Sequence, residues 1–417
     1  MLSAVEAERL IFTLVEPVRA IESVSLTDCL GRVLAAPARS KLDFPHWDNS
    51  AMDGYAVRSA DIAQVPTPLE IVSEIPAGTR PEITIKKGQA ARILTGAMMP
   101  NGADAVVMQE DTERQPGVEE DPKKGQANDR VMIFAIPKKG AFVRKQGSFY
   151  RAGSVLLESR RAIAPAEVAL LAAVQQTQIE VFRRPRIAIL STGSELIEPT
   201  QPLGPGQIVD SNQYALTALV AKAGAVPVPL GIVADNRSAV KEAIASALSQ
   251  SDMVLSSGGV SVGDYDYVDA VLEELGATLH VRSVAVKPGK PLTVATVERE
   301  EGRQLYFGLP GNPASAMVGF WRFVAPAIQR LSGLKEPRSL PFVWAKATSK
   351  LTAGGKRETY LWGDLKATDS GYEFARAAGG HSSGNLVNLA NTSGLGIVPV
   401  GETQIEIGEQ VRVLVCR

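Results

Sequence analysis

The amino-acid sequence predicts a multidomain protein that combines α/β and all-β folds around a central, doubly wound and mostly parallel α/β domain. Its 417 residues exceed what a single hydrophobic core usually organises. Strand-like and helix-like segments alternate between residues 185 and 331, which is the pattern of a parallel sheet covered by helices. On both sides of this region, short apolar runs are separated by Gly and Pro turns, which favours small β domains.

The α/β region contains four apolar runs that read as strands and four segments with helical periodicity. The strands are expected at Arg186–Leu190, Val226–Val233, Met253–Ser256 and Gln304–Gly308, and the helices near 212–223, 237–250, 266–276 and 313–331. The loops that follow parallel strands share one edge of the sheet, where ligands bind in such folds. We therefore expect four loops to meet in one crevice.

The N-terminal region begins with a helix signal, because Ser3 and Glu6 form a capping-box pattern ahead of an amphipathic run. Similar short segments flank a β-rich stretch, which suggests an insertion. The expected division is residues 1–49 and 140–180 as a discontinuous N-terminal dimerisation domain, 50–139 as an inserted small β domain with a mobile loop at 111–130, 181–334 as the α/β domain and 335–417 as a C-terminal β barrel. We expect a dimer because the small apolar helices of the N-terminal domain need a partner surface.

The composition narrows the class of protein. The 44 Lys and Arg residues balance the 45 Asp and Glu residues, so no basic surface for nucleic acid is expected. Cys29 and Cys416 lie at opposite ends of the chain, which argues against a disulfide framework. The first residues carry acids where a signal peptide carries Lys or Arg, and the most apolar segment is too short for a membrane helix. We expect a cytoplasmic protein that binds neither nucleic acid nor membrane.

The most informative stretch is a glycine-rich turn between a strand and a helix. The run Met253–Leu255 leads into Gly258, Gly259 and Gly263, and a helical pattern follows from Asp266. Such a turn directs backbone N–H groups at an anion, typically a phosphate. Asp264 and Asp266 beside it suit a hard cation shared with a phosphate ester. The alternative is a tight turn with solvated acids.

Three further stretches carry polar groups that no helical or strand periodicity explains. Lys287–Pro291 brings two ammonium groups around a stiff turn, which favours an anionic ligand, although a solvated basic turn is the alternative. Leu309–Pro313 starts a helix with free N–H groups, or is only a helix start. Asp48 and Asp53 lie on one loop and could bind a metal or orient water, or form local Asx turns.

Together these stretches closely resemble the motif series of the molybdopterin molybdenumtransferase (MoeA) family, to which the gephyrin E domain is related. The motifs are Asp48–Ala56, Leu94–Gly96 with Gly102–Val107, Ser191–Leu196, Ser257–Gly263, Lys287–Pro291 and Leu309–Pro313. Their order and spacing agree over nearly the whole chain, which makes the match specific, whereas any single motif is weak.

The resemblance implies an α/β domain like that of molybdopterin adenylyltransferase, an elongated N-terminal domain and a homodimer whose active cleft takes residues from both chains. It implies an enzyme of molybdenum cofactor biosynthesis that inserts molybdate into adenylated molybdopterin and releases AMP, with a divalent metal, usually Mg²⁺. Molybdopterin adenylyltransferase is a further partner that it suggests.

The motifs and the resemblance also imply site residues. Catalytic roles are expected for Asp53, Glu195, Asp235 and Asp266, and metal binding for Glu195, Asp235, Asp264 and Asp266. Substrate binding is expected for Thr95, Ser257, Gly258, Gly259, Ser261, Gly263, Lys287, Lys290, Pro310, Arg357 and Ser383. Among these, Lys287, Lys290 and Arg357 are the cations expected to hold molybdate.

The sequence departs from the family pattern at two places, and two other functions stay open. Trp362 stands where many relatives have arginine, and Ser382–Gly384 matches the usual turn loosely. One alternative is a competence-damage-type nucleotide hydrolase, whose glycine turn normally lacks the Val260–Gly263 continuation and whose chain lacks the domain of Asp53. The other is a scaffold that has lost catalysis, against which the retained acids and lysines argue.

Overall fold

The computed structural model describes residues 1–116, 129–259, 267–300, 302–336 and 341–416. The chain forms two compact units, one of Met1–Ala36, Ser159–Val168 and Thr177–Arg417, the other of Pro37–Glu158 and Ala169–Gln176. The expected fold class is confirmed within these units, while the boundaries expected for four domains stay a prediction. None of the described helices is long and apolar enough to cross a membrane.

The first unit is built on a six-stranded sheet in the order β16-β13-β17-β21-β20-β18. Four strands run parallel, as expected: β16 (Val226–Val233), β13 (Arg186–Thr192), β17 (Met253–Ser257) and β21 (Gly302–Leu309). Two antiparallel strands that the sequence reading did not include, β20 (Pro291–Arg299) and β18 (Thr278–Ser283), extend the sheet. The chain order changes direction at β13, so the crevice beyond β13 and β17 is the switch point where such sheets bind ligands.

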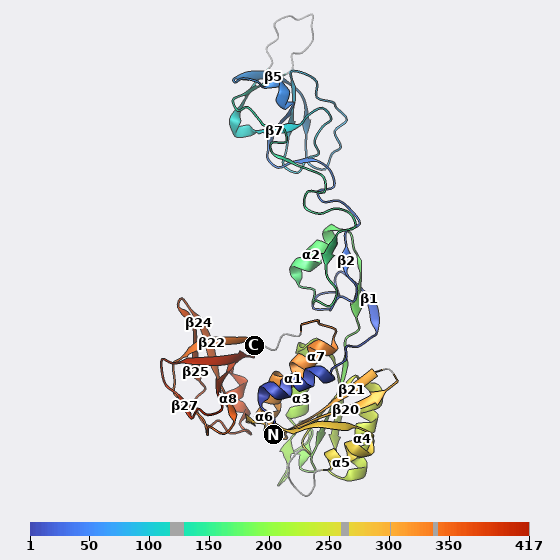
Figure 1. Cartoon of the computed structure of the whole chain (residues 1–417), viewed down its shortest axis with the longest axis vertical. Coiled ribbons are helices and arrows are strands. Elements are labelled where there is room, and N and C mark those ends of the chain that lie inside the picture. Colours follow the sequence, from blue (N-terminus) through green and yellow to red (C-terminus); the bar gives the residue numbers. More distant parts are fainter. Residues whose placement is uncertain (117–128, 260–266, 301, 337–340, 417) are drawn as a thin grey trace, which may run out of the picture. The chain divides into compact units, whose positions relative to one another are not determined.

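Helices cover both faces of this sheet (Figure 1). They are α3 (Asn212–Lys222), α4 (Arg237–Gln250), α5 (Val268–Glu274), α6 (Pro313–Gly319), a π-helical turn (Phe320–Val324) and α7 (Ala325–Leu331). A hydrophobic core lies on each face of the sheet. The side chains of successive residues in β13 pack into one core and then the other, because strand side chains alternate between faces. Ile187 and Ile189 pack with α3, α6 and α7, and Ala188 and Leu190 pack with α4 and α5.

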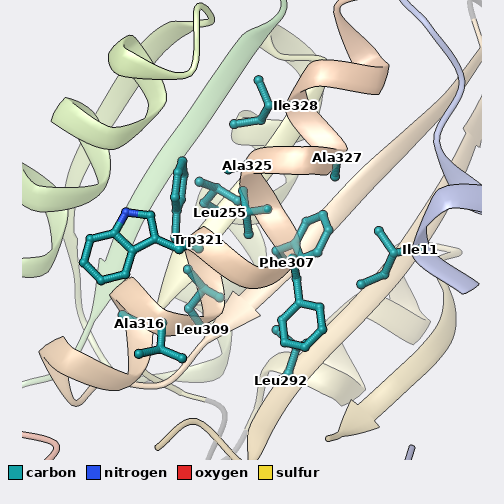
Figure 2. Close-up of a cluster of buried hydrophobic side chains, with 14 of the residues drawn as sticks. Ile11, Leu255, Leu292, Phe307, Leu309, Ala316, Trp321, Ala325, Ala327 and Ile328 are labelled. Carbon is teal, nitrogen blue, oxygen red and sulfur yellow. The ribbon is translucent and has the colours of Figure 1, made fainter. Parts of the chain in front are cut away.

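The N-terminal helix α1 (Ala4–Leu14) begins with the expected capping box, in which Ser3 and Glu6 bond to each other's backbone N–H. Its apolar side is buried in the same unit: Ala7 and Ile11 join the core that also holds Phe307 and Trp321 (Figure 2). The dimer argument required apolar helices that cannot be buried within their own chain, and α1 does not meet that condition. The homodimer therefore stays a prediction that rests on the family resemblance.

Strand pairs join residues before the expected insertion to residues after it, while the insertion itself stays a prediction. β1 (Ile21–Ser25) pairs with β12 (Gln178–Phe182), β2 (Ala38–Arg39) with β11 (Val155–Leu157), and β3 (Asn49–Ser50) with β10 (Val143–Arg144). The helix expected after Pro165 is α2 (Pro165–Ala173).

The inserted β domain of the second unit is a six-stranded sheet in the order β7-β4-β6-β5-β9-β8. Its strands are β4 (Gly54–Val57), β5 (Thr67–Ile75), β6 (Gln89–Ile93), β7 (Ala105–Met108), β8 (Thr112–Gln115) and β9 (Arg130–Ile133), with 3₁₀ turns at Ser59–Asp61 and Gln109–Asp111. The prediction of a loop from residue 111 is wrong at its start, because residues 112–115 pair with β9 as strand β8. Residues 117–128 lie outside the described chain.

The C-terminal region closes into a five-stranded barrel, as expected. β24 (Glu358–Thr368), β25 (Gly371–Arg376), β22 (Phe342–Ala347), β28 (Gln410–Val415) and β26 (Gly394–Val398) pair in turn, and β26 returns to β24. Short elements complete it: β23 (Leu351–Thr352), β27 (Gln404–Ile405) and α8 (Leu386–Ala390). β19 (Val286–Lys287) pairs with β24. The turn Lys287–Pro291, called the lysine turn below, therefore lies beside the barrel.

Candidate functional site

A cavity of about 1140 Å³ lies at the carboxyl edge of the six-stranded α/β sheet in the first unit. The loops that follow β13, β16, β17 and β21 all line it, which confirms that the four loops converge. Its remaining walls come from the turn between Lys287 and Pro291, from the loop that carries β14 (Leu196–Ile197) and β15 (Ile208–Val209), and from the barrel.

Two glycine turns meet at the floor of this cavity. Gly258 has a φ of +90°, and a Cβ atom there would lie 2.3 Å from the carbonyl oxygen of Thr192. The Gly258 N–H donates to the Leu309 carbonyl over 3.1 Å, and a Cβ atom on Gly311 would lie 3.6 Å from the Gly258 Cα. No larger residue fits at Gly258, because side chains avoid both this backbone conformation and such a contact.

Four cationic side chains line the cavity. Lys287 and Lys290 are exposed and have no hydrogen-bond or ion-pair partner in the described part of the chain. Arg357 comes from the barrel and donates to the Val286 carbonyl over 3.2 Å. Arg376 of β25 also lines the cavity, and the sequence reading missed it because nothing marks it beyond its place in a strand. The lysine turn and the barrel thus supply positive charge from two sides.

Two of the expected acids lie at the cavity wall. Glu195 and Asp235 both line it, and neither side chain is hydrogen-bonded or ion-paired within the described residues. The other two expected metal ligands, Asp264 and Asp266, lie outside the described residues, as do the expected substrate contacts Ser261 and Gly263. Across the described ranges, no group of three or more His, Cys, Asp or Glu side chains is arranged to hold a metal ion.

The expected contacts Ser257, Gly259 and Pro310 line the same cavity. A further strip of wall, Asp210, Ser211 and Asn212, was not predicted as part of the site. The sequence carried one signal for it: Asp, Ser and Asn before a helical run are typical of a helix N-terminus, where polar side chains gather. That signal predicts where a helix begins but not that a ligand cavity lies there, so it was insufficient to identify these three residues as part of the site.

Asp53 and Thr95 belong to the second unit, where they contact each other. The Thr95 backbone N–H and hydroxyl both donate to the same Asp53 carboxylate oxygen, each over 2.7 Å. These hydrogen bonds, that of the hydroxyl above all, lower the pKa of Asp53. Asp48 on the same loop has a structural role, since it pairs with Lys145 at 2.6 Å and accepts the Gln146 N–H.

The barrel positions that depart from the family pattern have different environments. Trp362 is 0% exposed and its ring lies 4.4 Å from that of His381, so it is a core residue and not an anion contact. Burial lowers the pKa of His381, which lines the cavity. Ser383 also lines the cavity, and its carbonyl accepts the Ala314 N–H at the start of α6.

Comparison with known proteins agrees with this architecture along the whole chain. The chain matches the MoeA N-terminal region (domains I and II) over residues 2–174, a probable molybdopterin binding domain over residues 188–330, and the MoeA C-terminal region (domain IV) over residues 344–416.

Two relatives that match nearly the full chain carry the same name. The molybdopterin molybdenumtransferase of Nostoc sp. is 52% identical, over 99% of this chain and 94% of its own length. That of Bacillus subtilis is 35% identical, over 95% and 90%. The crystal structure of the molybdopterin biosynthesis MoeA protein from Pyrococcus horikoshii OT3 superimposes with a TM-score of 0.81 at 26% identity and covers 100% of both chains. The chain therefore belongs to the molybdopterin molybdenumtransferase family.

Proposed function

We propose that this protein inserts molybdate into adenylated molybdopterin with release of AMP, in a reaction that depends on a divalent metal. The transferase class and the role in molybdenum cofactor biosynthesis follow from the family. The observation that carries the finer proposal is one cavity that combines two glycine turns, the lysine turn and two carboxylates that have no partner among the described residues. The competing hydrolase and scaffold functions have no comparable observation in their favour.

The glycine turns are the proposed site of the phosphoanhydride. Backbone N–H groups of the turn that follows β17 and of the Gly311 turn before α6 suit phosphate oxygens, and the absence of side chains lets the anion approach, although the Gly258 N–H itself already bonds to the Leu309 carbonyl. Release of AMP by hydrolysis requires the oxygen of a water molecule to bond to phosphorus while the bond from phosphorus to the bridging oxygen breaks; the bridging oxygen leaves with the other phosphate, the water gives up a proton, and such donors stabilise the developing negative charge. Ser257, Gly259 and Pro310 belong to the same surface.

The lysine turn and the barrel are the proposed site of molybdate. Lys287 and Lys290 carry ammonium groups without partners in the described chain, so an oxyanion there neutralises two like charges. Arg357 and the hydroxyl of Ser383 complete this side. We assign Arg376 no role beyond its charge.

Glu195 and Asp235 fit a Mg²⁺ ion, because magnesium is usually held by one or two carboxylates with water and phosphate oxygens as the other ligands. Bound there, the ion would neutralise charge on the phosphoanhydride. The two carboxylates themselves would fix its position, and without it they would repel the substrate. Asp264 and Asp266 stay proposed ligands on the sequence pattern alone.

We further propose that the protein acts as a homodimer and receives its substrate from molybdopterin adenylyltransferase. Asp53 and Thr95 are assigned to the same active cleft by the family resemblance, which implies a cleft made from two chains. The two hydrogen bonds that Thr95 donates to the Asp53 carboxylate favour its ionised form and fix its orientation.

The test is a defined reaction of the purified protein with adenylated molybdopterin, molybdate and MgCl₂. AMP is quantified by chromatography, and the molybdenum product by activation of a cofactor-free molybdoenzyme. We expect AMP and active cofactor to form together, and both to fall at least tenfold when EDTA removes the divalent metal. Formation of neither product from authentic substrate would overturn the proposal, and full AMP release in EDTA would overturn the metal requirement.

A further inference from the structure

One buried amide joins the two glycine turns. Asn212, the first residue of α3, is 8% exposed and lines the cavity. Its side-chain nitrogen donates to the Ser257 hydroxyl over 2.6 Å and to the Gly311 carbonyl over 2.7 Å. A carbonyl oxygen only accepts, so the atom that faces Gly311 must be the amide nitrogen, and both of its hydrogens are in use.

The backbone that carries this amide is itself fixed. One Asp210 carboxylate oxygen accepts the N–H groups of Asn212 and Gln213, each over 3.1 Å. The Gln213 side-chain oxygen accepts the Gly231 N–H of β16 over 2.7 Å. The first turn of α3 is therefore bonded to β16, to the end of β17 and to the loop after β21.

We propose that Asn212 is a positioning residue, which sets the spacing between the Gly258 turn and the Gly311 turn and so places the N–H groups that receive the phosphates. Glycine turns have no side chains of their own to interlock, so their separation depends on such bonds. The Gly258 N–H donates to the Leu309 carbonyl over 3.1 Å and the Ser257 hydroxyl to the Pro310 carbonyl over 3.4 Å, but the bond that reaches Gly311 itself comes from the Asn212 side chain. This inference rests on the proposed function.

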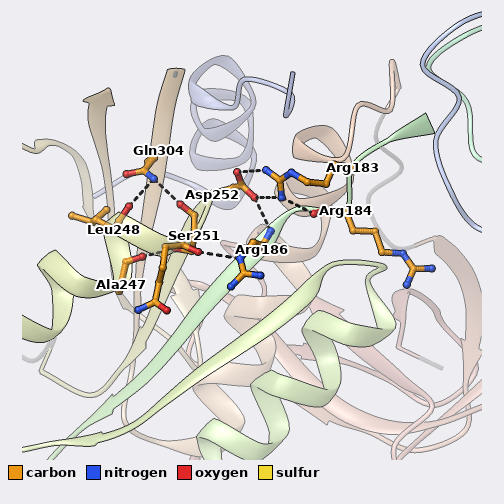
Figure 3. Close-up of polar contacts among 9 residues, drawn as sticks. Arg183, Arg184, Arg186, Ala247, Leu248, Ser251, Asp252 and Gln304 are labelled. Carbon is orange, nitrogen blue, oxygen red and sulfur yellow. Dashed lines mark hydrogen bonds and ion pairs between the residues drawn. The ribbon is translucent and has the colours of Figure 1, made fainter. Parts of the chain in front are cut away.

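The same sheet holds a matched control. The Gln304 side-chain nitrogen also donates two hydrogen bonds, to the Leu248 carbonyl over 2.8 Å and to the Ser251 carbonyl over 2.6 Å (Figure 3). Gln304 lies near the start of β21, at the edge of the sheet where the parallel strands begin (the amino edge). Asn212 lies at the opposite edge, where these strands end (the carboxyl edge). Loss of either amide removes two bonds from the same unit, but only one loss changes the proposed phosphate site.

The experiment compares Asn212→Ala and Gln304→Ala with the unchanged protein. Isothermal calorimetry with AMP and MgCl₂ measures affinity, and thermal denaturation measures stability. Both variants should lose a few degrees in Tm, since each loses two hydrogen bonds of about 1 kcal/mol. AMP should bind about tenfold more weakly to Asn212→Ala and within twofold of normal to Gln304→Ala.

A third variant separates hydrogen bonding from shape. Asn212→Asp keeps the size of the side chain but turns an acceptor oxygen toward the Gly311 carbonyl, so it should bind AMP no better than Asn212→Ala. Normal AMP affinity in Asn212→Ala, or recovery of affinity in Asn212→Asp, would overturn the positioning role. Failure of the unchanged protein to bind AMP would instead overturn the proposed function, and the inference with it.

Discussion

The two edges of the α/β sheet both carry charged cavities, yet their charges are arranged differently. The amino-edge cavity, of about 760 Å³, is lined by several arginines. Arg183 forms two bonds with Asp252, of 3.0 and 2.8 Å, and the Arg186 N–H and Nε bond to Asp252 and the Gln250 carbonyl (Figure 3). At the carboxyl edge, Lys287, Lys290, Glu195 and Asp235 have no such partners among the described residues.

The difference teaches that a charged cavity is not by itself a ligand site. Charges that bond to groups of their own chain stabilise the fold and leave little for a ligand. Charges at a cavity that have no partner among the described residues stay available to a ligand. The carboxyl edge also has the two glycine turns, at Gly258 and Gly311.

The largest expected effect is that of Gly258→Ala. A Cβ atom there meets the Thr192 carbonyl oxygen at 2.3 Å in a backbone conformation that disfavours side chains. We expect the free energy of unfolding to fall by about 3 kcal/mol or more, with loss of AMP binding.

Gly276→Ala is its control, because Gly276 also has a positive φ, +79°, but open space around its Cβ position. It should cost only about 1 kcal/mol, from backbone strain. Chemical denaturation measures both. Equal costs for the two variants would show that the close approach of the loops does not matter.

Lys290→Ala should lower turnover at limiting molybdate about a hundredfold, the scale lost with one charge contact in a transition state, and should weaken pterin binding much less. Arg303→Ala removes a cation from the amino edge, where Arg303 bonds to Glu298 at 2.6 Å, and should change turnover less than twofold. The measurement is rate against molybdate concentration. An unchanged apparent affinity for molybdate in Lys290→Ala would reassign this lysine to the pterin phosphate.

Asp252→Asn should destabilise the fold without affecting the reaction. It weakens a doubly bonded, half-buried pair with Arg183, so we expect a loss of about 1–2 kcal/mol in the free energy of unfolding. Urea denaturation gives this loss, and an assay of AMP release should give normal rates. A large loss of turnover in a folded variant would mean that the amino edge takes part in function.

The smallest effect concerns Asp53, an expected site acid that does have a partner. Its pKa is lowered by the Thr95 hydrogen bonds, so their stabilising contribution is present above the ordinary Asp pKa and is lost as the pH falls through the lowered value. Thr95→Val removes the hydroxyl bond and should raise the pKa of Asp53 in a carbon-13 NMR titration. If the pKa of Asp53 does not change in this variant, the Thr95 hydroxyl is not the group that lowers it.

Features that are local in the sequence were predicted well. The strands and helices of the α/β domain follow from periodicity, and the glycine and lysine turns follow from residues adjacent in the chain. Asn212 escaped prediction because its partners, Ser257 and Gly311, are distant in sequence and meet only in the folded sheet. Strands β18 and β20 escaped because an antiparallel extension has no signal in an alternating strand–helix pattern.

Two contacts were missed by the sequence analysis for a common physical reason. Helix α1 was expected to need another chain, but a buried surface within its own unit accepts its apolar face. Asp48, for which a metal or water role and a local Asx turn were both open, pairs with Lys145 from a distant segment. In each case, the deciding contact joins segments that a reading of local pattern treats separately.

Hydrogen exchange measured by mass spectrometry, with and without AMP and MgCl₂, tests the contrast between the two edges most directly. Ligand should slow exchange in residues 191–196, 257–259 and 309–313 of the carboxyl edge and leave residues 183–186, 248–252 and 302–304 of the amino edge unchanged. Protection confined to the amino-edge segments would contradict the account, because it would place the ligand beside Arg183 and Asp252, which already pair with each other.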